Sequence, residues 1–225
     1  MQSRYWPRSL YNSELNVGDV DVGDINVAVM EGFKQDGYVL SKLRVRQKGE
    51  ERIIHHYWFD SWPDHGVPKN LTTVWNMLKA VRNFSNSSEH PWVVHCSAGI
   101  GRTGTFLAID QGIQQLHSTG VADVITIIRK LREDRGGMVQ HLDQAEFVHR
   151  VLVKYAETYG APEESHESLM GEQQENGVLQ ASIEKALTSV PPGFTEHPSQ
   201  IDTHEGAEVC IYSGMNIKVI QYRRE

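Results

Sequence analysis

The chain of 225 residues is long enough for one domain with an appendage, and its 39% share of hydrophobic residues suffices for a core. A formal net charge of -7 without any basic run argues against nucleic acid as a partner. Two cysteines, Cys96 and Cys210, indicate no disulfide framework, no apolar run approaches a membrane span, and residues 1–7 do not look like a signal peptide, so we expect a cytoplasmic protein without membrane insertion.

The first part of the chain predicts an antiparallel set of strands followed by a helix. Apolar and β-branched residues alternate or run together at about 25–30, 38–46 and 52–59, with a turn at 47–50. The segment after them keeps helical spacing through its apolar residues, which are Leu71, Val74, Trp75, Leu78 and Val81.

The middle of the chain predicts one more strand and three helices. Residues 92–94 form a short apolar run typical of a buried strand, and 103–116 is predicted as a helix. Further helices are expected at about 122–134 and 141–158. We therefore expect an α/β fold in which a central mixed, twisted sheet is flanked by helices.

The composition changes after residue 160, so we predict a body at 1–159 and an acidic linker with an unassigned segment at 160–225. Residues 161–225 hold eleven of the 29 acidic and four of the 22 basic side chains, which leaves eighteen of each in residues 1–160. The whole net charge thus lies in this C-terminal appendage. A short helix at 178–190 and a hairpin of 209–212 with 217–220 are expected within it.

The run VVHCSAGIGRTG at residues 93–104 places a cysteine and an arginine at the two ends of a glycine-bearing turn. Glycines let successive backbone N–H groups converge on one point, and a helix that begins near Arg102 adds positive potential there. The arginine fork matches two phosphoryl oxygens. The predicted phosphate-binding amides belong to Ser97, Ala98, Gly99, Ile100 and Gly101.

The same surroundings activate a thiol. Amide dipoles, a helix N-terminus and a nearby guanidinium lower the pKa of a cysteine from about 8.5 to about 3.5–7.5. We therefore expect the Cys96 sulfur to be ionised at neutral pH and to act as a nucleophile toward phosphorus. Thr103 places a hydroxyl near this sulfur, where it could stabilise the sulfur as a leaving group.

Two further segments supply the groups that such chemistry needs. Expelling a tyrosine phenolate, whose parent pKa is about 10, requires a proton donor. The loop at 59–68 offers Asp64 for this role, with Trp62 as a buried anchor. Gln140 and Gln144 stand four apart, so on a helix they share a face, and either could hold the water that hydrolyses a phosphocysteine.

Each of these features has a plainer interpretation when taken singly. A lone cysteine after valines is usually a buried small hydrophobe, an aspartate in a Pro-Asp-x-Gly sequence is usually a turn residue, and two glutamines usually lie on a solvated helix face. Their joint occurrence favours a catalytic site.

The three blocks, in this order, resemble the catalytic domain of the cysteine-based protein tyrosine phosphatases. The resemblance rests on His-Cys-x5-Arg-Thr at 95–103, Trp-Pro-Asp at 62–64 and Gln-x3-Gln at 140–144, and it extends from about residue 2 to about residue 158. It implies hydrolysis of phosphotyrosine in partner proteins through a phosphocysteine, with no metal and no cofactor.

The resemblance also assigns roles. It implies Cys96 as nucleophile, Arg102 as phosphoryl clamp and Asp64 as general acid and then base. Gln140 and Gln144 would position water, while His95 would hold the loop and Thr103 would assist release of the sulfur.

The chain departs from the family pattern in two ways. A complete family domain begins well upstream of Tyr5-Trp6-Pro7, so we expect a domain that lacks its N-terminal part, including one wall of the substrate pocket. In the third block, His141 and Ala145 replace a small hydroxyl residue and an aromatic residue. An alternative function is therefore a catalytically impaired module that binds phosphotyrosine without hydrolysing it.

Overall fold

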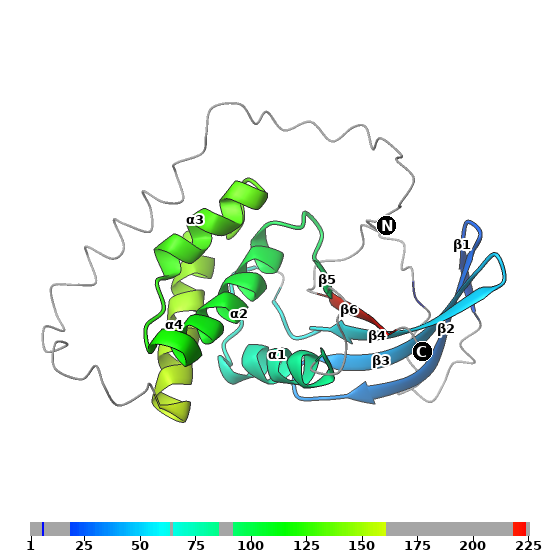
Figure 1. Cartoon of the computed structure of the whole chain (residues 1–225), viewed down its shortest axis with the longest axis horizontal. Helices are drawn as coiled ribbons and strands as arrows, with labels where there is room; N and C mark the ends of the chain where they lie inside the picture. Colours follow the sequence, from blue (N-terminus) through cyan, green and yellow to red (C-terminus); the bar gives the residue numbers. More distant parts are fainter. Residues whose placement is uncertain (1–5, 7–18, 64, 86–91, 161–217, 224–225) are drawn as a thin grey trace, which may run out of the picture.

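A six-stranded sheet runs through the part of the chain that the computed structural model describes, which is residues 6, 19–63, 65–85, 92–160 and 218–223. The strands are β1 (Val20–Val22), β2 (Ile25–Lys34), β3 (Val39–Gln47), β4 (Glu50–Trp58), β5 (Trp92–His95) and β6 (Lys218–Arg223). Their spatial order is β1-β2-β3-β4-β6-β5, and every neighbouring pair is antiparallel (Figure 1).

Alternation along β4 gives the sheet two covered faces. Side chains of a strand point alternately to opposite faces. His56, which is fully buried, and Trp58 lie on one face. There the Trp6 ring packs against both, with 4.8 Å between the ring centroids of Trp6 and His56. Tyr57 points to the other face and belongs to the main core beneath the helices.

Four helices complete the α/β body, namely α1 (Thr72–Ser85), α2 (Gly101–Thr119), α3 (Val124–Asp134) and α4 (Leu142–Tyr159). In Figure 1, α2, α3 and α4 gather on one side of the molecule, and α1 lies between them and the long strands. The core between them is built from large side chains that are fully or almost fully buried, among them Phe59, Met77, Leu78, Phe106, Ile109, Ile127, Ile128 and Phe147.

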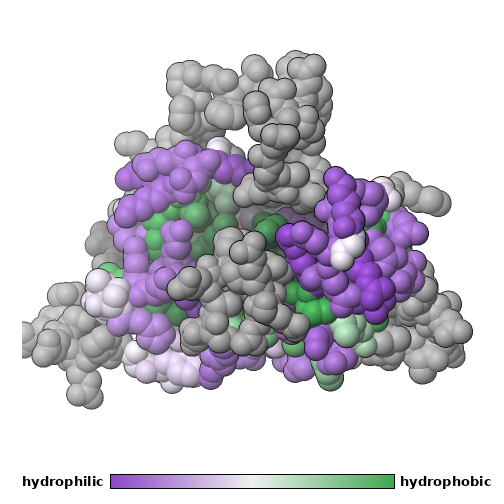
Figure 2. All heavy atoms as spheres, turned by 45° about the vertical axis from the view of Figure 1, so that its right-hand side comes forward, coloured by the Kyte–Doolittle hydropathy of each residue, from purple (hydrophilic) through white to green (hydrophobic). Residues whose placement is uncertain are grey.

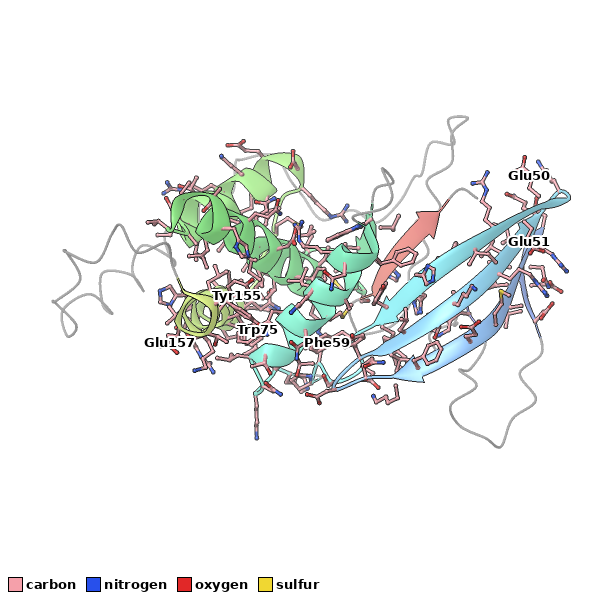
Figure 3. The ribbon with its side chains drawn as sticks, turned by 60° about the horizontal axis from the view of Figure 1, so that its bottom comes forward. Glu50, Glu51, Phe59, Trp75, Tyr155 and Glu157 are labelled. Atoms are coloured by element: carbon pink, nitrogen blue, oxygen red, sulfur yellow. The ribbon has the colours of Figure 1, made fainter. Side chains whose placement is uncertain are left out.

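An aromatic contact joins α1 to α4. The rings of Trp75 and Tyr155 meet edge to face with centroids 5.6 Å apart, and Figure 3 shows both side chains at the packing surface between the two helices. Trp75 is 4% exposed, as expected of a core residue. This packing holds α1, which follows the loop at 59–68, against α4, which follows the segment that carries Gln140.

The predicted α/β class is confirmed, and the sheet differs from expectation in how its strands pair. Every hydrogen-bonded pair of neighbouring strands is antiparallel, so a mixed sheet with parallel neighbours is not found among the described strands. β2 continues to Lys34 because a register shift between Val29 and Glu31 lets pairing with β3 resume.

The C-terminal predictions have mixed outcomes. Residues 218–220 are in a strand, as expected, but this strand pairs with β4 and β5. Its predicted hairpin partner at 209–212 and the predicted helix at 178–190 lie outside the described residues. The division of the chain at 159/160 stays a prediction.

The described surface is largely hydrophilic in the view of Figure 2, with apolar residues visible in its recesses. A few large apolar side chains are exposed singly, such as Val121 at 61%. None of the described helices combines the length and the apolar composition that crossing a bilayer requires.

Replacing Gly104 with alanine is expected to destabilise the fold by about 3 kcal/mol, at the upper end of what overpacking costs. Gly104 lies on α2 against the chain at Met138 and Val139, and a Cβ here would overlap the backbone nitrogen of Val139, which cannot move aside as a side chain can. Urea unfolding of Gly104→Ala measures this loss. Gly136→Ala is the matched control, because a Cβ there meets nothing within 4 Å; equal losses in the two variants would contradict the prediction.

Candidate active site

The first block of the sequence forms a tight loop between β5 and α2. β5 ends at His95, and α2 begins at Gly101, so Cys96 starts a connection of five residues. Gly99 has φ of +69°, in the left-handed region that glycine adopts without strain. Cys96 is a free cysteine and only 6% exposed.

The N-terminus of α2 supplies positive potential to this loop. Ile100 precedes the helix, and within the described residues no side chain caps this end. The first amides of a helix have no intrahelical acceptor, and together with the helix dipole they favour an anion. This is the electrostatic setting that the sequence predicts for a thiolate and a phosphoryl group.

His95 holds the first peptide of the loop. Its Nδ1 lies 3.2 Å from the carbonyl oxygen of Cys96. A carbonyl oxygen only accepts, so Nδ1 carries the proton and donates it. The contact agrees with the predicted role of His95 in holding the loop.

Arg102 connects the loop to the Trp-Pro-Asp segment. Its Nη2 donates to the carbonyl oxygen of Pro63 at 2.7 Å, and its guanidinium carbon lies 5.8 Å from the ring centroid of Trp62. The two loops that sequence analysis assigned to one reaction are therefore in direct contact.

Trp62 anchors the second loop, as the sequence predicts. The ring is 3% exposed and packs edge to face against Phe59 and Phe147, each at 5.8 Å between centroids. Its Nε1 donates to the carbonyl oxygen of Gly66 at 3.1 Å, which closes the loop on itself. Asp64, the predicted general acid, lies outside the described residues.

The side chains of Gln140 and Gln144 lie close together, but the two residues do not share one helix face as the sequence predicts. Gln140 precedes α4, and only Gln144 lies on it. Gln144 is 7% exposed, and its Oε1 accepts from the backbone nitrogens of Gln140 at 2.9 Å and His141 at 3.3 Å. Its carbonyl is thereby committed to the backbone at the start of α4, which leaves the exposed Gln140 as the better candidate to hold water.

The side-chain amides of Gln140 and Gln144 pack closely against Gly101, which leaves room for them because it has no side chain. A Cβ there would lie 3.1 Å from Nε2 of Gln144 and 3.2 Å from Oε1 of Gln140. Contacts this short require the glutamines to shift. The first residue of α2 thus sets where the third block lies.

A cavity of about 280 Å³ opens among the three blocks. An engineered protein cavity of about 150 Å³ holds a benzene molecule, so this one has room for an aromatic ring and a phosphoryl group. Its lining residues are His65, Gly66, Cys96, Ser97, Ala98, Gly101, Arg102, Gln140, His141, Asp143 and Gln144. Gly99, Ile100, His95 and Thr103 are among the predicted site residues that do not line it.

The Thr103 hydroxyl is buried and makes no hydrogen bond within the described part of the chain, to the Cys96 sulfur included. The expected assistance to the leaving sulfur therefore has no hydrogen bond behind it in this structure, and it stays a prediction.

Across the described ranges, no three His, Cys, Asp or Glu side chains gather closely enough to hold a metal ion.

Sequence reasoning did not single out several residues that the fold brings to the site. Nη2 of Arg135 donates to the carbonyl oxygen of Ala98 at 3.3 Å, and Arg135 also lies beside Gly99. Asp143 lines the cavity, and one of its carboxylate oxygens is buried without a partner among the described residues. His65 lies in the loop at 59–68 and Asp143 within the third block, and this position is a signal that could have found them, whereas Arg135 is brought in only by tertiary folding.

Comparison with known proteins agrees with this geometry. The model of the family described as protein-tyrosine phosphatase matches residues 1–154. The chain belongs to the protein-tyrosine phosphatase family.

Three relatives illustrate how far the similarity extends. Human receptor-type tyrosine-protein phosphatase R is 39% identical over 155 residues, which cover 67% of this chain and 22% of that protein.

Human tyrosine-protein phosphatase non-receptor type 7 is 34% identical over 154 residues, covering 68% of this phosphatase-family chain and 40% of the relative. Rat tyrosine-protein phosphatase non-receptor type 5 is 36% identical over 156 residues, with the same two coverages. The chain therefore spans between about a fifth and two fifths of these relatives. Both receptor and non-receptor types are among them.

Proposed function

We propose that this chain hydrolyses phosphotyrosine in proteins through a phosphocysteine intermediate. Membership of the family and the similarity to tyrosine-protein phosphatases support tyrosine dephosphorylation as the reaction class. The observation that carries the proposal is that one cavity is lined by Cys96 and Arg102, from the first block at 95–103, which we call the phosphate loop, and by Gln140 from the third block.

In the first step, the Cys96 thiolate attacks phosphorus and forms an S–P bond while the P–O bond to the tyrosine breaks. Arg102 and the amides of residues 97–101 neutralise the equatorial oxygens, where charge is spread in the transition state. Asp64 gives its proton to the departing phenolate oxygen. Dephosphorylated tyrosine leaves, and the phosphoryl group stays on sulfur.

In the second step, water attacks phosphorus and the S–P bond breaks, which restores the thiolate and releases inorganic phosphate. The Asp64 carboxylate takes the proton from the attacking water. Gln140 holds this water in line with the S–P bond, which is a positioning contribution. The buried amide of Gln144 keeps the segment that carries Gln140 in place through its two backbone contacts.

The test is turnover of a tyrosine-phosphorylated peptide by the purified chain, combined with rapid acid quenching. We expect release of inorganic phosphate and a phosphoryl group on the peptide that contains Cys96, located by mass spectrometry. A matched phosphoserine peptide tests the preference for the longer aromatic side chain. A folded chain that binds the phosphotyrosine peptide without releasing phosphate would instead support the alternative of an impaired binding module.

Replacing the two glutamines separately is expected to give different defects. Gln140→Ala should slow hydrolysis of the phosphoenzyme about 10- to 100-fold, the scale of misplacing a reacting group, and should leave stability unchanged. Gln144→Ala should lower the free energy of unfolding by about 1–3 kcal/mol, because two backbone donors lose their acceptor. Quench-flow detection of the phosphoenzyme and urea unfolding measure the two effects. The assignment fails if Gln140→Ala accumulates no phosphoenzyme.

A further inference from the structure

Strand β5 leads directly to Cys96, and within the described residues it joins the sheet through β6. All four residues of β5 pair with β6, from Trp92 opposite Gln221 to His95 opposite Lys218. On its other side, β6 pairs with β4. The strand that precedes the nucleophile is thus fastened to the rest of the sheet by a segment from beyond residue 217 (Figure 1).

β4 and β5 cannot pair across the space that β6 fills. Neighbouring strands lie about 4.8 Å apart, so two strands with a third between them are separated by roughly 10 Å, beyond hydrogen-bonding reach. In β4, the residues facing β6 include His56 and Tyr57, which are 0% and 2% exposed. Buried backbone groups need partners, so β4 requires a neighbouring strand at this edge.

The two ends of the phosphate loop are held by different parts of the molecule. α2, at the Arg102 end, is held by core residues such as Phe106 and Ile109, which are fully buried. β5, at the Cys96 end, has four residues; its backbone pairs with β6, while its Trp92 and Val94 side chains pack at the edge of the main core. Within the described residues, the strand hydrogen bonds at this end come from β6, so we expect the place of Cys96 relative to Arg102 to depend on whether β6 is seated.

We propose that residues 218–223 are a positioning strand for the phosphate loop, and that the slot between β4 and β5 accepts this sequence as a separate strand as well as in the intact chain. Seating of β6 sets the catalytic geometry, and its release uncouples Cys96 from Arg102. The activity part of this inference rests on the proposed function, and the strand pairing does not.

Two proline variants of the full chain separate positioning from general damage. Proline lacks the N–H that a ladder needs. Ile220 lies between His56 of β4 and Val93 of β5, so Ile220→Pro interrupts β6 within the stretch that has a neighbouring strand on both sides. Arg223 lies opposite Ile53 of β4, beyond the end of β5, so Arg223→Pro is the matched control.

We expect Ile220→Pro to lower kcat about 10- to 100-fold, the effect of a small misplacement of the nucleophile, with KM little changed. Arg223→Pro should stay close to the unmodified chain. The pH profile of Cys96 alkylation by iodoacetamide should move to higher pH in Ile220→Pro only, because the thiol is then displaced from the α2 amides. Unchanged kcat and an unchanged profile in Ile220→Pro, or equal losses in both variants, would overturn the proposal.

Rescue in trans tests the slot itself. A synthetic peptide of residues 217–224, added to Ile220→Pro, should restore kcat and the alkylation profile in a saturable manner. The same peptide with proline at the position of Ile220 should restore neither. Lack of rescue by the unmodified peptide would overturn acceptance of a separate strand.

Hydrogen exchange on the unmodified chain keeps the inference testable even if Ile220→Pro does not fold. The Val93 and Val94 amides should be protected no more strongly than those of Val219 and Ile220, which face them in the ladder. Stronger protection in β5 would show another anchor and overturn the proposal. If the chain hydrolyses no phosphotyrosine while the exchange and alkylation results hold, the proposed function fails and the positioning strand stands.

Discussion

Replacing Cys96 with serine is expected to abolish phosphate release from a phosphotyrosine peptide, with a fall of about 10⁵-fold or more, as on removal of an enzyme nucleophile. A serine hydroxyl is not ionised at neutral pH, and residues 97–101 of the loop include no side chain that could act as a base to activate it. The amides and Arg102 remain, so the variant should still bind the peptide. Phosphate release and fluorescence anisotropy of a labelled peptide measure the two properties.

Cys210→Ser is the matched control, because it makes the same chemical change at the other cysteine of the chain. It should turn over at the rate of the unmodified protein. Substantial turnover by Cys96→Ser would remove Cys96 from its assigned role. Loss of activity in Cys210→Ser would indicate that general damage, and not the nucleophile, explains the first result.

The sequence predicts the elements of the body well because their patterns are local. Alternation of apolar residues predicts the strands that the structure gives as β2, β3 and β4, and helical spacing predicts α1. The position of β6 could not be predicted in this way. A strand pattern does not specify its partner, so residues 217–220 suggested a local hairpin, whereas the backbone of β6 pairs with the distant β4 and β5.

The same distinction between local patterns and tertiary packing applies to the residues of the site. A strand, a glycine turn and a helix follow one another at 92–119, so local sequence predicts that Cys96 and Arg102 lie at the two ends of one loop. The contact of Arg102 with Pro63 and that of Arg135 with Ala98 arise from tertiary packing. The glutamines were expected to share a helix face, and they differ because α4 begins only at Leu142.

Replacing Asp64 with alanine is expected to lower kcat about 10²- to 10⁴-fold for a phosphotyrosine peptide, which is the usual contribution of a general acid. The loss should be much smaller for an aryl phosphate whose phenol is strongly acidic, because such a leaving group departs without a proton. A general acid works only when protonated, so the fall of kcat at high pH should also disappear in the variant. Steady-state rates for both substrates across pH measure these effects.

Asp60→Ala provides the control for removing a carboxylate from the same segment. Asp60 accepts a hydrogen bond from Lys34, away from the cavity lining, so its loss should not change how the rate depends on the leaving group. A uniform loss for both substrates in Asp64→Ala would contradict proton donation to the phenolate. The dependence on the leaving group therefore decides between an acid that takes part in P–O cleavage and an aspartate that only shapes the loop, because only the former senses the basicity of the departing oxygen.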